Sequence, residues 1–328
     1  MSMLSPRTRV AVIRGGPSSE YEVSLKSGAH VLSLLRESPE TYEPVDIFIS
    51  KDGEWHRDGL VHEPHRALKH IDVVFNAMHG AYGEDGQLQQ LLEAMHIPFT
   101  GSGVLGSALA MNKELAKNIY NQHSLLTPRH EVITDEADDK QLLYIFQNYL
   151  HPVIVKPASG GSSIGIRLAR TFQELEEAVK HAFGYSKKVL VEEFIRGKEG
   201  TCGVVENARG QQLYALLPVE IRSHGKDFFD FDSKYSGETE EICPGNFKPA
   251  EREMMAEMAR KAHQALGLRH YSRSDFLITP KGKVYIIETN SLPELTEESL
   301  LPKSLKAVGW QPREFVSHCL NLALNRVG

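Results

Sequence analysis

Two segments near the start of the chain each place a short apolar run before a glycine-rich loop. The first run covers residues 9–14 and is followed by Gly15-Gly16-Pro17, and the second covers 71–77 and is followed by the polar loop 79–86. Because a helical pattern follows each loop, we expect strands that alternate with helices in a parallel α/β sheet. Ligands of such sheets bind at the carboxyl ends of the strands, where both glycine loops fall.

The residues around these loops predict where the helices begin. Ser19 with Glu22 three residues later is the pattern of a capping box, so we expect the first helix to begin there and interpret Glu22 as its capping acid. A second helix is expected over 87–95. We interpret Glu84 and Asp85, which precede it, as loop polarity and a helix cap.

The rest of the chain predicts two further units in which strands and helices mix. The expected elements are a helix from 102 to about 123, a strand over 151–156 with the loop 157–165, a short strand, a helix capped by Thr171 and Glu174, and strands over 188–195, 201–205 and 213–221. A polar excursion over 222–247, a helix from about 250 to 266, a hairpin over 274–290 and a helix over 312–324 complete the prediction.

Composition limits the kinds of partner. The 328 residues include 37 Lys and Arg against 43 Asp and Glu, a net charge of −6 whose sign argues against a nucleic-acid partner. No stretch approaches the roughly 18 consecutive apolar residues that a membrane span needs, and Met1 to Arg9 lacks the apolar core of a secretion signal. We therefore expect a cytoplasmic protein with no membrane partner. Cys202, Cys243 and Cys319 are odd in number and widely spaced, which predicts free thiols.

The segment 272–290 reads as a hairpin that carries acidic side chains. If Lys281-Gly282 is its turn, Asp275 faces Glu288, and Asn290 lies on the same side. Two carboxylates directly opposite each other repel, so a hard divalent cation between them would explain the pattern, and an all-oxygen set favours magnesium or manganese. The hairpin alone equally fits a solvated sheet face.

A lysine and a glycine-serine loop follow one of the predicted strands. Lys156 ends the run 151–156 and leads directly into Gly160-Gly161-Ser162-Ser163. A point charge beside bare backbone N–H groups suits a phosphate, although such a loop taken alone is more often a simple turn. A metal hairpin elsewhere in the same chain makes the phosphate interpretation the better one.

Together these motifs resemble the D-alanine–D-alanine ligase family of ATP-grasp enzymes over nearly the whole chain. Five blocks carry the resemblance, namely 15–25, 79–86, 101–113, 155–165 and 273–302, and a sixth, 228–235, resembles the loop that covers the nucleotide in that family. The resemblance implies an α/β fold of the ATP-grasp type with an N-terminal parallel-sheet domain over 1–107, a central α+β lobe over 108–196 and a C-terminal catalytic lobe over 197–328.

The resemblance also implies how ATP and its metal are held between the two α+β lobes. The expected nucleotide-binding residues are Lys113, Lys156 and Lys234 at the phosphates, Ser163 over them, Glu192 and Ile195 at the adenine, and Glu199 at the ribose. Asp275, Glu288 and Asn290 would carry two magnesium ions, or manganese, in agreement with the hairpin. Since the family tends to be dimeric, a homodimer is implied.

The implied reaction joins two D-alanines into D-alanyl-D-alanine for peptidoglycan precursor synthesis, at the expense of ATP and through an acyl phosphate. The implied catalytic and substrate-binding residues are Glu20 at the first ammonium with His79 beside it, Tyr235 and Ser162 in a chain with Glu20 that closes a lid, Arg273 at the oxyanion, and Ser299 with Leu300 at the second carboxylate. Singly, His79 could be a loop histidine, Tyr235 a surface aromatic and Ser299 a helix N-cap.

One departure from the family pattern keeps the substrate open. Glu294 follows Pro293 where the family normally has a glycine whose N–H helps to stabilise the oxyanion. This favours, as an alternative, a related carboxylate–amine ligase with a different pair of amino acids. Another alternative is a non-catalytic nucleotide-binding protein, against which the phosphate lysines, the metal ligands and Arg273 are all retained.

Overall fold

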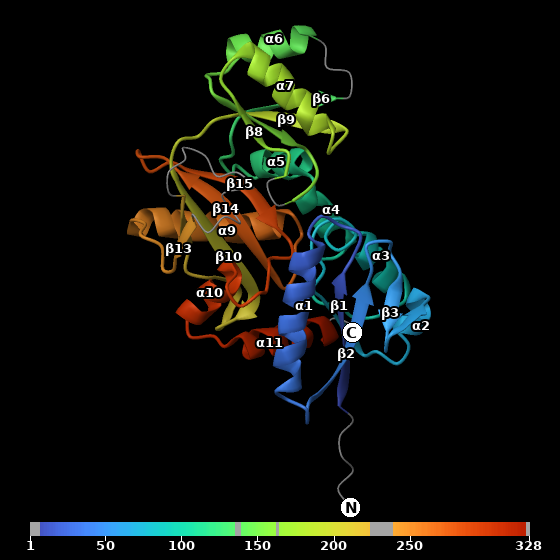
Figure 1. The fold of residues 1–328 in the computed structure, drawn as a ribbon. Coiled ribbons are helices and arrows are strands. Elements are labelled where there is room, and N and C mark those ends of the chain that lie inside the picture. The colour runs from blue at the N-terminus through green and yellow to red at the C-terminus, as the bar shows by residue number, and fades with distance from the viewer. Residues whose placement is uncertain (1–6, 135–138, 162–163, 224–238, 326–328) are drawn as a thin grey trace, which may run out of the picture.

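The computed structural model describes residues 7–134, 139–161, 164–223 and 239–325, and its strands form three separate sheets (Figure 1). The first sheet has the order β4-β3-β2-β1-β5. Its elements are β1 (Thr8–Gly15), α1 (Tyr21–Arg36), β2 (Tyr42–Ile49), β3 (Trp55–Arg57), β4 (Leu60–His62), α2 (Pro64–Ala67), β5 (Val73–Asn76) and α3 (Gln87–Ala94). Strand β1 pairs in parallel with both β2 and β5, as predicted, whereas β3 and β4 extend the sheet by antiparallel pairing.

This sheet is buried on both faces, which is why the middle of β1 (residues 10–13) and of β5 (residues 73–75) is a continuous apolar run. Val10 and Val12 belong to one core together with residues of α1 and of the C-terminal helix α11 (Pro312–Leu324). Ala11 and Ile13 point into the opposite core together with residues of α2 and α3. The last helix of the chain therefore packs against the first sheet, as Figure 1 shows for α11 beside α1.

The second sheet is a four-stranded antiparallel sheet in the order β6-β9-β7-β8, with α6 and α7 packed on it. Its elements are β6 (His130–Thr134), α6 (Asp139–Asn148), β7 (Val153–Pro157), β8 (Arg167–Ala169), α7 (Phe172–Phe183) and β9 (Lys188–Glu193). Helix α7 begins as predicted, because Thr171 accepts a hydrogen bond from the N–H of Glu174 at 3.2 Å and Glu174 accepts one from the N–H of Arg170.

The third sheet has six strands, with β13-β12-β10-β14-β15 side by side and β11 paired to β10. Its elements are β10 (Lys198–Ala208), β11 (Gln211–Ala215), β12 (Val219–Ser223), β13 (Thr239–Ile242), α9 (Pro249–Ala265), β14 (Tyr271–Ile278), β15 (Val284–Asn290) and α10 (Leu300–Ala307). Helix α9 shares its core with buried residues of α4 (Val104–Met111) and α5 (Lys113–Gln122).

Two predicted elements are divided in the structure. The single helix expected over 102–123 is wrong, because Asn112 has an extended backbone (ψ 103°) between α4 and α5 and its side chain caps α5 by accepting from the N–H of Leu115. The single strand expected over 213–221 is also wrong. Pro218, which has no N–H to donate, lies between β11 and β12.

The start of α1 differs from the prediction as well. The helix begins at Tyr21, and Glu20 takes the N-cap position without a side-chain cap. Ser18 instead accepts the N–H of Glu20 at 3.1 Å. The capping box of Ser19 and Glu22 is therefore wrong, and Glu20 lies at the carboxyl-end edge of the first sheet rather than inside the helix.

The hairpin keeps its predicted pairing by a different route. The expected two-residue turn at Lys281-Gly282 is wrong, because Ile278 pairs with Val284 and the loop spans 279–283. A bulge at Ile287 adds one residue to β15, and this restores the register so that Asp275 lies opposite Glu288, as predicted.

Two predictions from composition can be compared with the described residues. Cys202, Cys243 and Cys319 are free thiols, as expected. None of the described helices combines the length and apolar character needed to cross a membrane.

Candidate active site

A cleft of about 540 Å³ is lined by residues of the four-stranded and six-stranded sheets and of the segments around them. It brings together nine of the predicted site residues, which are Lys113, Lys156, Glu192, Ile195, Glu199, Arg273, Asp275, Glu288 and Leu300. Lysines, carboxylates and apolar side chains thus share one cleft, which is the mixture of groups that a nucleotide with its phosphates requires.

A buried carboxylate joins two lysines at the wall of this cleft. Glu192 on β9 lies 2.9 Å from the ammonium of Lys156 on β7 and 3.1 Å from that of Lys117 on α5. Burial opposes ionisation of Glu192, but the two lysines outweigh it and lower the pKa of its carboxyl. Burial lowers the pKa of Lys117 to about 8. Sequence reasoning missed Lys117, because a lysine within a helix gives no local signal that it is buried.

The glycine-rich loop after β7 is tied to the start of α5. The N–H of Lys113 donates to the carbonyl of Ala158 at 2.8 Å, and its ammonium donates to the carbonyl of Gly160. The same ammonium lies 3.8 Å from a carboxylate oxygen of Glu288 on β15. Burial lowers the pKa of Lys113. The break between α4 and α5 therefore places a cation between the glycine loop and the acidic hairpin.

The acidic face of the hairpin opens on the cleft. Arg273 donates two hydrogen bonds to Asp275, and Thr201 donates a further one. The side chains of Arg273 and Asp275 are only 9% and 16% exposed, so the alternative of a solvated sheet face is wrong for this pair. Glu288, with 42% of its side chain exposed, faces Asp275 across the ladder.

These oxygen donors fit a hard divalent cation. Asn290 accepts one hydrogen bond from the N–H of Leu292, which leaves its amide oxygen a second lone pair. Two opposed carboxylates and one amide oxygen, with neither thiol nor imidazole, are the ligand types that magnesium and manganese prefer.

A smaller cavity of about 60 Å³ adjoins the glycine loop and the hairpin, and several of the residues predicted to bind the amino acid line it. It is lined by residues that include Glu20, His79, Glu84, Lys113, Arg273, Glu288, Asn290 and Glu294. The carboxylate of Glu20 lies against two glycines from different parts of the chain. A Cβ added to Gly80 or Gly161 would lie 2.9 Å or 2.7 Å from Glu20 Oε2, so both positions need glycine for this approach.

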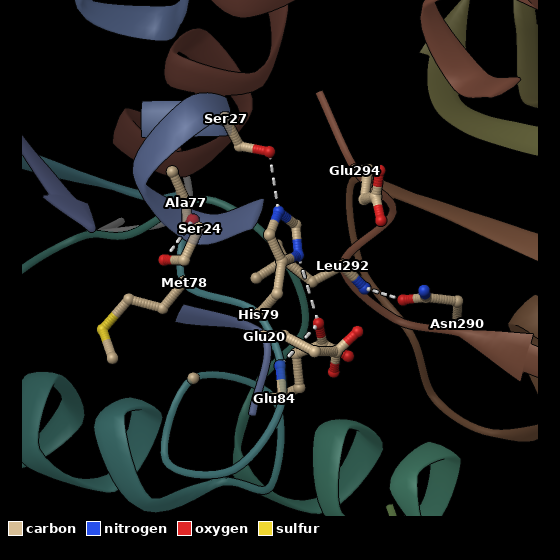
Figure 2. Close-up of polar contacts among 12 residues, drawn as sticks. Glu20, Ser24, Ser27, Ala77, Met78, His79, Glu84, Asn290, Leu292 and Glu294 are labelled. Carbon is tan, nitrogen blue, oxygen red and sulfur yellow. Dashed lines mark hydrogen bonds and ion pairs between the residues drawn. The ribbon is translucent and has the colours of Figure 1, made fainter. Parts of the chain in front are cut away.

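His79 is buried between Ser27 and Glu84 (Figure 2). Its Nδ1 lies 3.2 Å from Glu84 Oε1 and its Nε2 lies 2.8 Å from Ser27 Oγ. Burial alone would favour the neutral ring, but Glu84 outweighs it and raises the pKa of His79. The interpretation of Glu84 as loop polarity is wrong, since it is buried and orients the imidazole. The N-cap of α3 is Gly86, and Asp85 before it accepts from the N–H of Gln87, the first residue of the helix.

The remaining predicted residues lie partly outside these cavities. Ser299 takes the N-cap position of α10 without a side-chain cap, and its hydroxyl donates to Glu294 at 3.2 Å and contacts Thr296. Leu300 lines the larger cleft. Four predicted residues, namely Ser162, Ser163, Lys234 and Tyr235, lie outside the described residues, as does the predicted lid block 228–235.

Curated relatives are similar to the chain over almost its full length. A D-alanine–D-alanine ligase of Geobacter sulfurreducens is 42% identical over 307 residues, which are 92% of this chain and 90% of that protein. One of Geotalea uraniireducens is 40% identical over 326 residues, which are 97% of this chain and 96% of that protein.

Solved structures share the fold, and confirm the expected ATP-grasp arrangement. The VanG D-Ala:D-Ser ligase of Enterococcus faecalis superposes with a TM-score of 0.84 at 28% identity, over 97% of this chain and 100% of that one. The D-alanine–D-alanine ligase of Coxiella burnetii gives 0.83 at 25% identity, over 98% and 95%.

Family models match both halves of the chain. The model for the D-ala D-ala ligase N-terminus matches residues 9–64 and 57–102, and the model for the D-ala D-ala ligase C-terminus matches 121–321. Matches of this extent, together with relatives at about two-fifths identity, show that the chain belongs to the D-alanine–D-alanine ligase family.

Proposed function

We propose that this protein is an ATP-dependent ligase that joins two D-alanine molecules into D-alanyl-D-alanine, releasing ADP and phosphate for peptidoglycan precursor synthesis. The observation that carries the proposal is the cleft, in which Lys113, Lys156, Asp275 and Glu288 meet beside Glu20 in a chain of this family. The substrates are accordingly small molecules, namely ATP and D-amino acids.

The cleft supports a specific placement of ATP. Lys113 and Lys156 would neutralise its phosphates, the N–H groups of the glycine loop would approach them closely, and Ile195 and Glu199 would contact the adenosine. Lys156 is already fixed by Glu192, which spares the cost of ordering it when ATP binds. Asp275, Glu288 and Asn290 would hold magnesium, which supplies charge neutralisation at the phosphates when bound.

The protein residues suit the two bond-forming steps. Glu20 would hold the ammonium of the first D-alanine and so position that substrate. A carboxylate oxygen of this D-alanine attacks the γ-phosphorus of ATP, the bond from that phosphorus to the ADP oxygen breaks, and an acyl phosphate forms. The uncharged amine of the second D-alanine then attacks the acyl carbon, the bond to phosphate breaks and the amine loses a proton. Arg273, buried at the junction of both cavities, would stabilise the negative oxygen of that step.

Ser299 and Leu300 would receive the carboxylate of the second D-alanine, and Ser162, Ser163, Lys234 and Tyr235 would close the site.

We propose a cytoplasmic homodimer, with the three-part division at 107 and 196, on the strength of the family resemblance. Sedimentation of the purified chain tests the assembly, because a homodimer has twice the mass of the 36.7 kDa chain.

The proposal is tested by incubating the protein with ATP, magnesium and D-alanine while ADP and dipeptide are measured. Equal amounts of ADP and D-alanyl-D-alanine are expected, and neither is expected when D-alanine is replaced by L-alanine. ATP binding without ADP release in any of these mixtures would contradict the proposal and support a nucleotide-binding protein without catalysis. ADP release and dipeptide formation only with another amino acid would identify the alternative ligase.

A further inference from the structure

Glu294 lies where the proposed reaction needs room for a second amino acid. It follows Pro293 in the connection between β15 and α10, and its Oε2 accepts a hydrogen bond from the hydroxyl of Ser299 at 3.2 Å. It lines the small cavity together with Glu20, His79 and Asn290. Figure 2 shows Glu294, Glu20 and Asn290 on the side of the imidazole away from Ser24.

This contact places a protein carboxylate in the subsite proposed for the carboxylate of the acceptor. The hydroxyl of Ser299 would otherwise donate to that acceptor carboxylate, but it already donates to Glu294. Arg273, a cation of the same cavity, is engaged by both oxygens of Asp275. An acceptor that brings only a carboxylate therefore meets a like charge at this point.

Two other acidic residues of the cavity lie beside cations. Glu84 is paired with His79, and Glu288 lies 3.8 Å from the ammonium of Lys113. Within the described part of the chain, no Lys, Arg or His nitrogen lies within ion-pair distance of Glu294, whose hydrogen-bond donor is a neutral hydroxyl. Arg273 and His79 interact with this charge only from beyond ion-pair distance, where it helps to raise the pKa of each, so a ligand cation can still pair directly with Glu294.

We propose that Glu294 determines acceptor specificity, so that the enzyme uses, besides D-alanine, D-amino acids whose short side chain ends in an ammonium group. This inference rests on the proposed function. If the hydroxyl of Ser299 turns from Glu294 to an acceptor oxygen at roughly 2.8 Å, that oxygen lies within about 6 Å of Glu294 Oε2, which is itself 3.2 Å from Ser299. Only a cation a few bonds from the acceptor carboxyl carbon fits between them, which selects a short side chain.

A single side chain can determine the choice of acceptor, because the backbone fold does not fix which acceptor is used. Solved structures named as a D-Ala:D-Ser ligase and as a D-alanine–D-alanine ligase superpose on this chain almost equally well, with TM-scores of 0.84 and 0.83. Individual side chains around the acceptor must therefore discriminate between acceptors, and Glu294 is a charged one in that position.

The test is a competition between two acceptors of almost equal size. D-2,3-diaminopropionate and D-serine differ by an ammonium in place of a hydroxyl, and both are offered at equal concentration with limiting D-alanine, ATP and magnesium. Mass spectrometry measures the ratio of the two mixed dipeptides. We expect the wild type to favour the diamino acid by about tenfold, and Glu294→Gln, which keeps the size and the contact with Ser299, to remove that preference. Glu298→Gln, at a side chain that is 87% exposed, is the matched control and should keep it.

Two results would overturn the inference. One is a wild-type ratio near one, and the other is a preference that Glu294→Gln and Glu294→Gly both retain. Hydroxylamine separates this failure from that of the proposed function, because it traps the acyl phosphate of D-alanine as a hydroxamate whatever acceptor is preferred. Hydroxamate without discrimination contradicts the role of Glu294 alone, whereas the absence of hydroxamate and ADP contradicts the proposed function and this inference with it.

Discussion

The guanidinium of Arg273 donates to both carboxylate oxygens of Asp275, from Nε at 3.0 Å and from Nη2 at 2.9 Å. The two residues are neighbours on the same face of β14. Burial opposes the charge of Arg273, but Asp275 outweighs it and raises the pKa of the guanidinium. Asp275 therefore neutralises Arg273, and in the proposed enzyme it would also contribute oxygen to the metal site.

We expect Asp275→Asn and Glu288→Gln to differ in stability although both lose magnesium-dependent turnover. Asp275→Asn leaves Arg273 buried without its partner and should lower the free energy of unfolding by roughly 3 kcal/mol. Glu288→Gln should lower the free energy of unfolding by less than about 1 kcal/mol, because the side chain of Glu288 is 42% exposed. Denaturant unfolding and a magnesium titration of ADP release measure the two effects.

Glu253→Gln on α9, at a side chain that is 76% exposed, is the control for both variants. It should leave the magnesium titration and the unfolding curve unchanged. A normal magnesium titration in Glu288→Gln would show that the hairpin does not carry the metal.

Glu192→Gln should be among the most destabilising single changes in the cleft. Removing the carboxylate leaves Lys117 and Lys156 buried without their shared partner, at a cost of roughly 3–5 kcal/mol in the free energy of unfolding. Because folding lowers the pKa of Glu192 below its ordinary value of 4.5, its contribution is complete above pH 4.5 and is lost as pH falls through the folded-state pKa. The stability gap between wild type and variant should shrink in that acidic range, and a gap that grows there would contradict the assignment.

The pair of His79 and Glu84 predicts a pH dependence of the opposite sign. Folding raises the pKa of His79 above 6.5, so the stability it contributes is complete below pH 6.5 and is lost as pH rises through the folded-state pKa. Glu84→Gln should therefore cost roughly 1–3 kcal/mol near pH 6 and progressively less at alkaline pH. Unfolding curves at several pH values measure this difference. The double variant tests whether His79 causes this pH dependence. If His79→Asn alone abolishes it, then adding Glu84→Gln to His79→Asn should leave the remaining pH dependence of the free energy of unfolding unchanged.

Gly161→Ala should act on the first D-alanine through Glu20. A Cβ there would lie 2.7 Å from Glu20 Oε2 and would force the carboxylate to move. Since small displacements of a positioning group are costly, we expect the KM for D-alanine at the first site to rise about tenfold or more. An unchanged KM in Gly161→Ala would show that Glu20 does not hold the substrate.

Local sequence patterns predicted the elements whose cause is local. The assumed hairpin register placed Asp275 opposite Glu288, and Thr171 with Glu174 marked the start of α7. The same hairpin also shows what local patterns cannot predict, because the predicted turn is wrong and a bulge at Ile287 restores the predicted register. A bulge depends on how both strands pack, and neither strand alone encodes it.

The parts that could not be predicted depend on how loops and distant segments fold together. Lys117 is buried against Glu192, which is separated from it by most of the central unit, so no pattern within a short window reveals this pair. Glu84 is only five residues from His79, but it resembles an ordinary loop acid until the fold of their shared loop brings the two side chains together.

An isotope experiment tests activation through an acyl phosphate by following oxygen from D-alanine to phosphate. D-alanine labelled with ¹⁸O in its carboxylate is incubated with the enzyme, magnesium and unlabelled ATP, and the released phosphate is analysed by mass spectrometry. If a carboxylate oxygen attacks the γ-phosphorus and leaves with phosphate when the second amine attacks the acyl carbon, each phosphate carries one ¹⁸O. Phosphate released with no ¹⁸O while dipeptide forms would contradict activation through an acyl phosphate.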